Sequence, residues 1–217
     1  MLIDILLSGK NVAIFGGGKE ATFKVQKILD DIPSVTVVSR AFSSEILDIS
    51  RKESGVSLVE FDLNSDLARL VNLIPRPDIA IIATDDPKLN RKLNDFTRGL
   101  GAMVCVVDTP ELCDFAMPAI AKFGESVRVG ISTRGNSPAM ASVIRKKIEA
   151  TITEMDLLQI RLQEHVRKIG KDHIANFEDR KKALYDVIEN KEVNSLLEKN
   201  QYDDAKRIAE AIILSRK

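Results

Sequence analysis

The chain has 217 residues, of which 44% are hydrophobic and 29% are charged, a composition typical of a globular protein with one large domain or a domain plus an appendage. Its formal net charge of +0 argues against a dedicated nucleic-acid binder, and no apolar run approaches the roughly 20 residues that a membrane-spanning helix needs. Two cysteines form neither a disulfide framework nor a zinc motif. We therefore expect a cytoplasmic protein without nucleic-acid or membrane partners.

The first predicted strand, residues 12–15, is a nearly continuous apolar run that is typical of a buried parallel strand. Three glycines and a helical pattern follow it, in the spacing Gly16-x-Gly18-x-x-Ala21. In this pattern the first glycine permits a tight turn, the second lets a pyrophosphate approach the backbone, and the alanine lets the helix pack closely. The sequence predicts a dinucleotide site with the pyrophosphate at the helix N-terminus; a tight turn without a ligand is the alternative.

Further strands alternate with helices along the next ninety residues. Such alternation predicts an α/β fold with a parallel, Rossmann-type sheet and right-handed crossovers. The predicted strands are 35–38, 56–61, 78–84 and 103–107, and the predicted helices are 43–53 and 90–100. Ligands bind such sheets at the carboxyl ends of the strands. We expect one crevice to hold the residues at these ends, namely Gly16, Ser39, Thr84, Asp85 and Asp108.

The pattern changes in the second half of the chain. Residues 119–123 and 127–132 predict a hairpin, and Ser137-Pro138 predicts the start of a helix. Only helical periodicity follows, which indicates a small helical domain. The predicted domains are residues 1–112 (Rossmann-type, nucleotide-binding), 113–150 (hairpin plus helix) and 151–217 (helical). Because two strands and a helix cannot bury this much apolar surface alone, we expect region 113–150 to form a homodimer.

The residue after the second strand bears on the choice between NAD and NADP. NAD sites often place an acidic residue at this position to bind the ribose hydroxyls. The chain has Ser39-Arg40 here instead, and an arginine is able to hold a 2′-phosphate or to be merely solvated. The site chemistry alone leaves NAD and NADP open.

Five segments in one order resemble the precorrin-2 dehydrogenase family of sirohaem synthesis, which includes the N-terminal half of bacterial sirohaem synthase. They are residues 16–21 (Gly-Gly-Gly-Lys-Glu-Ala), 83–86 (Ala-Thr-Asp-Asp), 106–108 (Val-Val-Asp), 113–119 (Cys-Asp-Phe-Ala-Met-Pro-Ala) and 131–138 (Ile-Ser-Thr-Arg-Gly-Asn-Ser-Pro). The match runs from about Leu2 to about Ile152, and the helical tail is similar only in kind.

The resemblance implies NAD-dependent oxidation of precorrin-2 to sirohydrochlorin by a dimer, with iron insertion in some members. It carries cofactor contacts to Lys19, Glu20, Arg40 and Ala41, and the family's important aspartate to Asp108. A serine of the bacterial enzyme's loop falls on Thr133. The resemblance favours NAD as the cofactor, although Arg40 departs from a simple NAD site.

Two residues have further roles on chemical grounds. An ionised carboxylate near a nicotinamide is able to accept a proton, and the same Asp108 carboxylate could contact a metal transiently if the chain inserts iron. The alternative for Asp108 is a helix cap. Because the implied substrate carries carboxylates, Arg134 in its polar loop is the expected substrate contact. Two rival functions remain: another Rossmann NAD(P) oxidoreductase, and a non-catalytic NAD-sensing module.

Overall fold

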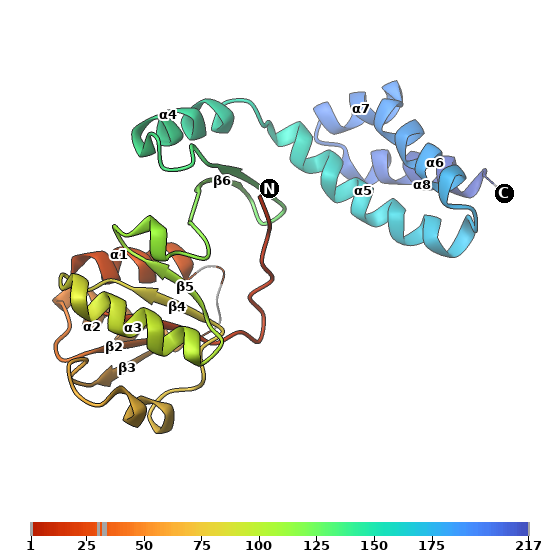
Figure 1. Cartoon of the computed structure of the whole chain (residues 1–217). Helices are drawn as coiled ribbons and strands as arrows, with labels where there is room; N and C mark the ends of the chain where they lie inside the picture. Colours follow the sequence, from red (N-terminus) through yellow and green to blue (C-terminus); the bar gives the residue numbers. More distant parts are fainter. Residues whose placement is uncertain (1, 30, 32–33, 217) are drawn as a thin grey trace. The chain divides into compact units, whose positions relative to one another are not determined.

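The computed structural model describes residues 2–29, 31 and 34–216, and its contacts divide the chain into two compact units, Met1–Met117 and Pro118–Lys217 (Figure 1). The first unit holds a parallel sheet with helices, and the second holds a hairpin and five helices. The predicted separation of residues 113–150 from residues 151–217 stays a prediction.

The first unit is built on a five-stranded parallel sheet, which confirms the predicted α/β class. The strands lie in the order β3-β2-β1-β4-β5. Their bounds are β1 Val12–Phe15, β2 Val35–Ser39, β3 Val56–Glu60, β4 Ile79–Ile82 and β5 Met103–Val106. The strand order runs outward in both directions from the β1–β4 pair, so this pair is the topological switch point, where such sheets bind ligands.

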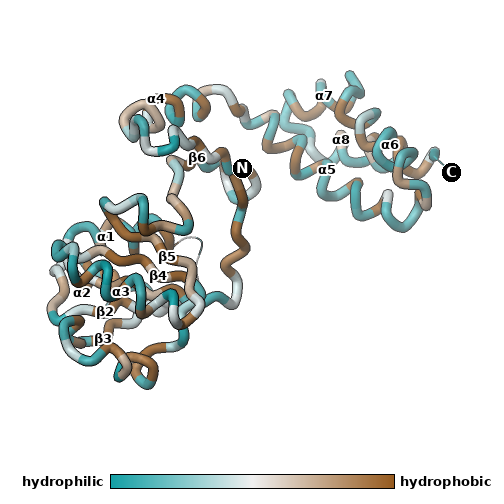
Figure 2. Tube along the Cα trace, in the orientation of Figure 1, coloured by the Kyte–Doolittle hydropathy of each residue, from teal (hydrophilic) through white to brown (hydrophobic). Residues whose placement is uncertain are grey.

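Helices cover both faces of this sheet, because successive strand side chains point to opposite faces. Val12 and Ile14 pack with α1 (Lys19–Ile28) and α2 (Ser44–Lys52), whereas Ala13 and Phe15 pack with α3 (Pro87–Gly99) and the 3-10 helix η1 (Leu67–Asn72). Figure 2 shows the strands as the apolar centre of this unit. A second 3-10 helix, η2 (Pro110–Leu112), follows β5.

Two details differ from the sequence prediction. Helix α3 begins at Pro87 rather than at Asn90, because the Asp86 carboxylate accepts hydrogen bonds from the N–H groups of Lys88 and Leu89 and so starts the helix earlier. Helix η1 was not predicted, since a 3-10 helix of six residues with two buried leucines gives too weak a periodic signal.

The second unit begins with the predicted hairpin, β6 (Ala119–Phe123) and β7 (Val127–Ile131), followed by α4 (Pro138–Glu149). Ser137 caps α4 as predicted, accepting a hydrogen bond from the Met140 N–H. Within the described part of the hairpin and α4, Ala121 and Ala141 are the only fully buried apolar residues. These elements therefore bury little of their own apolar surface.

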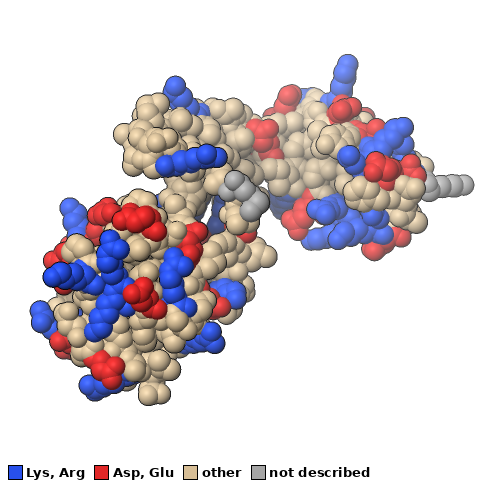
Figure 3. Space-filling view, viewed as in Figure 1, with Lys and Arg blue, Asp and Glu red and all other residues tan. Residues whose placement is uncertain are grey.

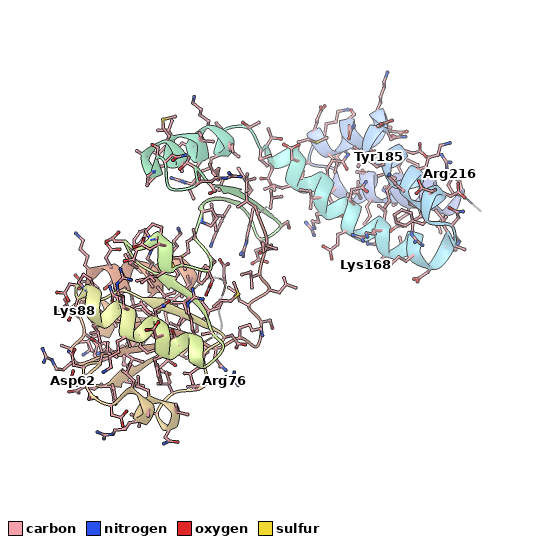
Figure 4. All side chains as sticks on the ribbon, in the orientation of Figure 1. Asp62, Arg76, Lys88, Lys168, Tyr185 and Arg216 are labelled. Carbon is pink, nitrogen blue, oxygen red and sulfur yellow. The ribbon has the colours of Figure 1, made fainter. Side chains whose placement is uncertain are left out.

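Four further helices pack around one apolar core, which confirms the C-terminal helical region. They are α5 Glu154–His173, α6 Phe177–Glu189, α7 Lys191–Glu198 and α8 Tyr202–Leu214. Arg216, labelled in Figure 4, forms an ion pair with Asp186 of α6. Basic and acidic side chains are interspersed on the visible face of each unit (Figure 3). Across the residues placed by the structure, none of the helices is both long enough and apolar enough to cross a bilayer.

Candidate functional site

The glycine turn after β1 lies at the switch point, and its three glycines differ in whether the fold leaves room for a side chain. Gly16 has φ +124°, and a Cβ atom there would lie 2.3 Å from the Ala83 carbonyl oxygen. At Gly17 a Cβ atom would lie 1.9 Å from the Ala41 carbonyl oxygen. A Cβ atom at Gly18 would meet nothing within 4 Å, and its φ of −90° suits any residue. The fold thus requires the first two glycines but leaves open space at the third.

The N-terminus of α1 faces this open space without a cap of its own. Gly18 is the N-cap residue and supplies no side-chain hydrogen bond. In contrast, Ser43 caps α2 and Asp86 caps α3. The free N–H groups and the positive end of the helix dipole make the start of α1 suited to an anion such as a pyrophosphate. Lys19 and Glu20, the predicted contacts of the first turn, are both exposed there.

Hydrogen bonds from the first turn of α1 and the start of α2 fix the shape of the glycine turn. The Ser43 N–H donates to the Gly17 carbonyl at 2.8 Å, and the Thr22 hydroxyl donates to the Gly18 carbonyl at 3.0 Å. The hydroxyls of Thr22 and Ser43 share a further hydrogen bond of 2.9 Å. No local pattern in the sequence indicates a role for Thr22, because its partner Ser43 lies 21 residues away. The position of Ser43 just before a predicted helix is a signal that the sequence does carry.

The residues after β2 lie beside the same turn. A Cβ atom on Gly17 would come within 2.8 Å of the Ser39 hydroxyl, so Ser39 and Ala41 border the turn directly. Arg40 is exposed, and its guanidinium makes no hydrogen bond or ion pair to the residues that the structure describes. Its charge is therefore available to a ligand or to solvent, as the sequence left open.

The turn after β4 forms the other side of the glycine turn. The Thr84 hydroxyl donates to Asn90 Oδ1 at 2.6 Å, and Asn90 Nδ2 donates to the Thr84 carbonyl at 3.1 Å. Asp85 is exposed, and Asp86 caps α3, so the cap interpretation is confirmed for the second aspartate only. Asn90 was missed because an asparagine within a helical pattern carries no recognisable signal in one sequence.

Asp108 follows β5 in an exposed position next to the end of β4, since the Val107 N–H donates to the Ile82 carbonyl at 2.9 Å. Its φ is +61°, a left-handed conformation that Asp and Asn adopt more readily than other non-glycine residues. The cap interpretation is wrong, because Thr109 is the N-cap of η2 and no side chain caps that helix. Within the described ranges the Asp108 carboxylate has no hydrogen-bond or ion-pair partner. It is thus free for chemistry.

The neighbouring polar side chains have structural partners. Asp114 forms an ion pair with Arg98 at 2.8 Å and accepts the Val104 N–H at 2.8 Å. Burial and the adjacent Cys113 raise the pKa of the Cys105 thiol to about 11, so that this thiol stays protonated at neutral pH. The prediction that Cys105 is part of the core is confirmed.

Thr133 and Arg134 lie in the second unit, on the loop between β7 and α4. The Thr133 hydroxyl accepts the Ser137 N–H at 3.1 Å, which ties the loop to the start of α4. Arg134 is exposed with φ +52°, and its N–H donates to the Ser132 hydroxyl at 3.2 Å. The guanidinium is therefore presented from a locally fixed backbone.

A dinucleotide fits the first unit on its geometry: an unfilled space at Gly18, an uncapped helix N-terminus, and polar groups at the ends of β2, β4 and β5. Among the residues that the structure describes, no group of three or more His, Cys, Asp or Glu side chains could hold a metal ion.

Comparisons with known proteins agree with this geometry. The family described as NAD(P)-binding matches residues 3–119. A precorrin-2 dehydrogenase of Methanosarcina barkeri is 35% identical over 211 residues, which are 96% of this chain and 91% of that protein. Siroheme synthases of Stutzerimonas stutzeri and Pseudomonas entomophila are 30% and 32% identical over 81% and 76% of this chain.

The chain spans only 36% and 35% of the length of these two synthases. A solved structure titled "SirC, precorrin-2 dehydrogenase" superimposes with a TM-score of 0.70, covering 95% of this chain and 98% of that one. The sequence identity in this superposition is 19%, so it shows a shared fold.

Proposed function

The chain belongs to the precorrin-2 dehydrogenase family, and from this premise we propose that it oxidises precorrin-2 to sirohydrochlorin with NAD, in sirohaem biosynthesis. The observation that carries the proposal is Gly18, a glycine that the fold does not require, facing open space at the uncapped start of α1. The absence of a side chain at this position is explained if the pyrophosphate of a nicotinamide dinucleotide approaches this backbone.

The reaction removes two electrons and two hydrogens from the tetrapyrrole, one as hydride and one as a proton. NAD, when bound, supplies the hydride acceptor. The free N–H groups at the start of α1 would hold the pyrophosphate, and Ser39, Arg40 and Ala41, which lie beside the glycine turn or follow β2, would hold the adenine ribose. The unpartnered Asp108 carboxylate accepts the proton. Arg134 pairs with a substrate carboxylate, and Thr133 holds the backbone of its loop.

NAD rather than NADP is the proposed cofactor, because NAD is the cofactor that the resemblance to the family implies. The chain lacks the acidic residue that often follows β2 in NAD sites, and the exposed Arg40 stands there instead. Because Arg40 has no partner among the residues placed here, it is also the group that would hold a 2′-phosphate if the proposal fails. The ratio of kcat/KM for NAD and NADP therefore tests the choice of cofactor.

Two copies of the chain are proposed to associate through residues 113–150. Met140 and Val143 of α4 are 48% and 43% exposed, although both are large and apolar. The two-stranded hairpin beside α4 has one fully buried apolar side chain, Ala121. A hairpin of two strands is marginal by itself, so a second copy that covers these residues would stabilise both.

The decisive experiment is an anaerobic assay with precorrin-2 and NAD, in which the absorbance of the reduced nicotinamide reports turnover. We expect turnover with formation of sirohydrochlorin. A different Rossmann oxidoreductase would not bind the tetrapyrrole, and a NAD-sensing module would bind NAD without turnover. Iron insertion by the same chain stays a prediction, in which Asp108 contacts the metal substrate transiently; adding Co²⁺ or Fe²⁺ to the completed reaction tests it.

A further inference from the structure

The wall of the glycine turn on the β4 side is held by one buried asparagine. The Gly16 backbone lies so close to Ala83 that a Cβ atom would be 2.3 Å from the Ala83 carbonyl oxygen, so residues 83–84 form this wall. Asn90, on the first turns of α3, is 5% exposed. Its amide binds both the carbonyl and the hydroxyl of Thr84, at 3.1 and 2.6 Å. One side chain thus fixes the conformation of the turn that faces the glycines.

The needs of α3 itself do not explain this arrangement. Asp86 already caps the helix, accepting hydrogen bonds from the N–H groups of Lys88 and Leu89. A buried amide costs free energy unless it is hydrogen-bonded, and an apolar residue beside Leu89 and Leu93 would be cheaper to bury. The polar contact to Thr84 is therefore what an asparagine adds at this position.

We propose that Asn90 is a positioning residue for the cofactor, which acts through Thr84 on the wall of the glycine turn. Asn90 engages the Thr84 hydroxyl and carbonyl and so fixes the orientation of this residue. The Thr84 backbone N–H makes no hydrogen bond to the described residues and is the group that a bound dinucleotide can use. Hydrogen bonds from a neighbouring side chain to a residue that lines a site hold that site in its productive geometry. The inference rests on the proposed binding of NAD at the glycine turn.

The test replaces Asn90 by leucine, which has nearly the same shape and no hydrogen-bonding groups. We expect Asn90→Leu to raise the Kd and the KM for NAD by roughly tenfold or more, because small misplacements of binding groups are costly. The matched control is Asn94→Leu. Asn94 is also 5% exposed and lies one turn further along α3, but its amide contacts only Arg98 and Asp95 of its own helix. Asn94→Leu should leave the NAD affinity unchanged.

Thr84 variants separate positioning from stability and decide the question even if Asn90→Leu does not fold. Thr84→Val removes the hydroxyl that Asn90 holds and should weaken NAD binding, whereas Thr84→Ser retains the hydroxyl and should restore the affinity. The Thr84 hydroxyl also accepts the Asp86 N–H at 3.3 Å. The double variant N90L/T84V isolates the hydrogen bond between Asn90 and the hydroxyl, because Asn90→Leu alone already removes it. If this bond is the one that matters, the double variant should bind NAD with the same affinity as Asn90→Leu.

The proposal is overturned if Asn90→Leu and Thr84→Val bind NAD like the wild type, or if Asn94→Leu weakens NAD binding equally. A further loss in the double variant would also count against the proposal, because the Thr84 hydroxyl would then act through the Asp86 N–H or the cofactor rather than through Asn90. These outcomes differ from failure of the proposed function, which would appear as a wild-type chain that does not bind NAD or that binds NAD without turnover of precorrin-2.

Discussion

Gly18→Val is the sharpest perturbation, because the fold tolerates a side chain at this position and the proposed cofactor does not. The Gly18 backbone has φ −90° and ψ −164°, an extended conformation in which β-branched residues are common, and a Cβ atom meets nothing within 4 Å. The cost to folding is the exchange of one N-cap residue, about 1 kcal/mol at most. The melting temperature should therefore fall by about 4 °C or less.

The cost to cofactor binding is much larger. The valine side chain would fill the space through which, in the proposed function, the pyrophosphate reaches the N–H groups of α1. A hydrogen bond to a charged group contributes roughly 1.5–3 kcal/mol, so losing one or two of them costs about 3 kcal/mol. This amounts to roughly a hundredfold increase in the Kd for NAD. Gly17→Ala should fail differently, by unfolding, since its Cβ atom would lie 1.9 Å from the Ala41 carbonyl oxygen.

Isothermal titration calorimetry with NAD measures the affinity, and circular dichroism checks the fold and melting temperature of the same preparation. Gly99→Ala is the matched control, because Gly99 at the end of α3 also has open space around its Cβ position. This control should bind NAD normally. A folded Gly18→Val protein with wild-type NAD affinity would refute the reasoning and place the cofactor elsewhere.

Three further predictions concern the remaining site residues and the assembly. Asp108→Asn should reduce kcat roughly 10²–10⁴-fold, because an amide cannot accept the proton. NAD affinity and melting temperature should stay unchanged, because asparagine tolerates the same φ of +61°. Normal turnover would instead make the exposed Asp85 the candidate base, since Asp114 is paired with Arg98. In steady-state kinetics NAD should have the higher kcat/KM, and Arg40→Ala should leave this preference in place; an NADP preference that Arg40→Ala abolishes would reverse the cofactor proposal. Val143→Asp should convert a dimer to a folded monomer in light scattering, whereas a wild-type chain that is monomeric at all concentrations would contradict the proposed interface.

The sequence by itself determined the class of the fold and the place of the glycine turn. Both are local properties: a buried strand is an apolar run of four or five residues, a helix is a 3.6-residue period, and the glycine pattern occupies six positions between them. Since parallel strands end at one edge of the sheet, residues such as Ser39 and Asp108 could be assigned to that edge without coordinates.

Only the tertiary structure decided how the turn is held and which of its glycines the fold itself requires. The partners of Gly16 and Gly17 are backbone carbonyls of Ala83 and Ala41, which lie dozens of residues further along the chain, so no local pattern distinguishes these glycines from Gly18. The clamp of Asn90 on Thr84 and the freedom of the Asp108 carboxylate likewise depend on where side chains point after packing. Hydrogen bonds of this kind are directional over about 3 Å, a precision that residue type and spacing do not carry.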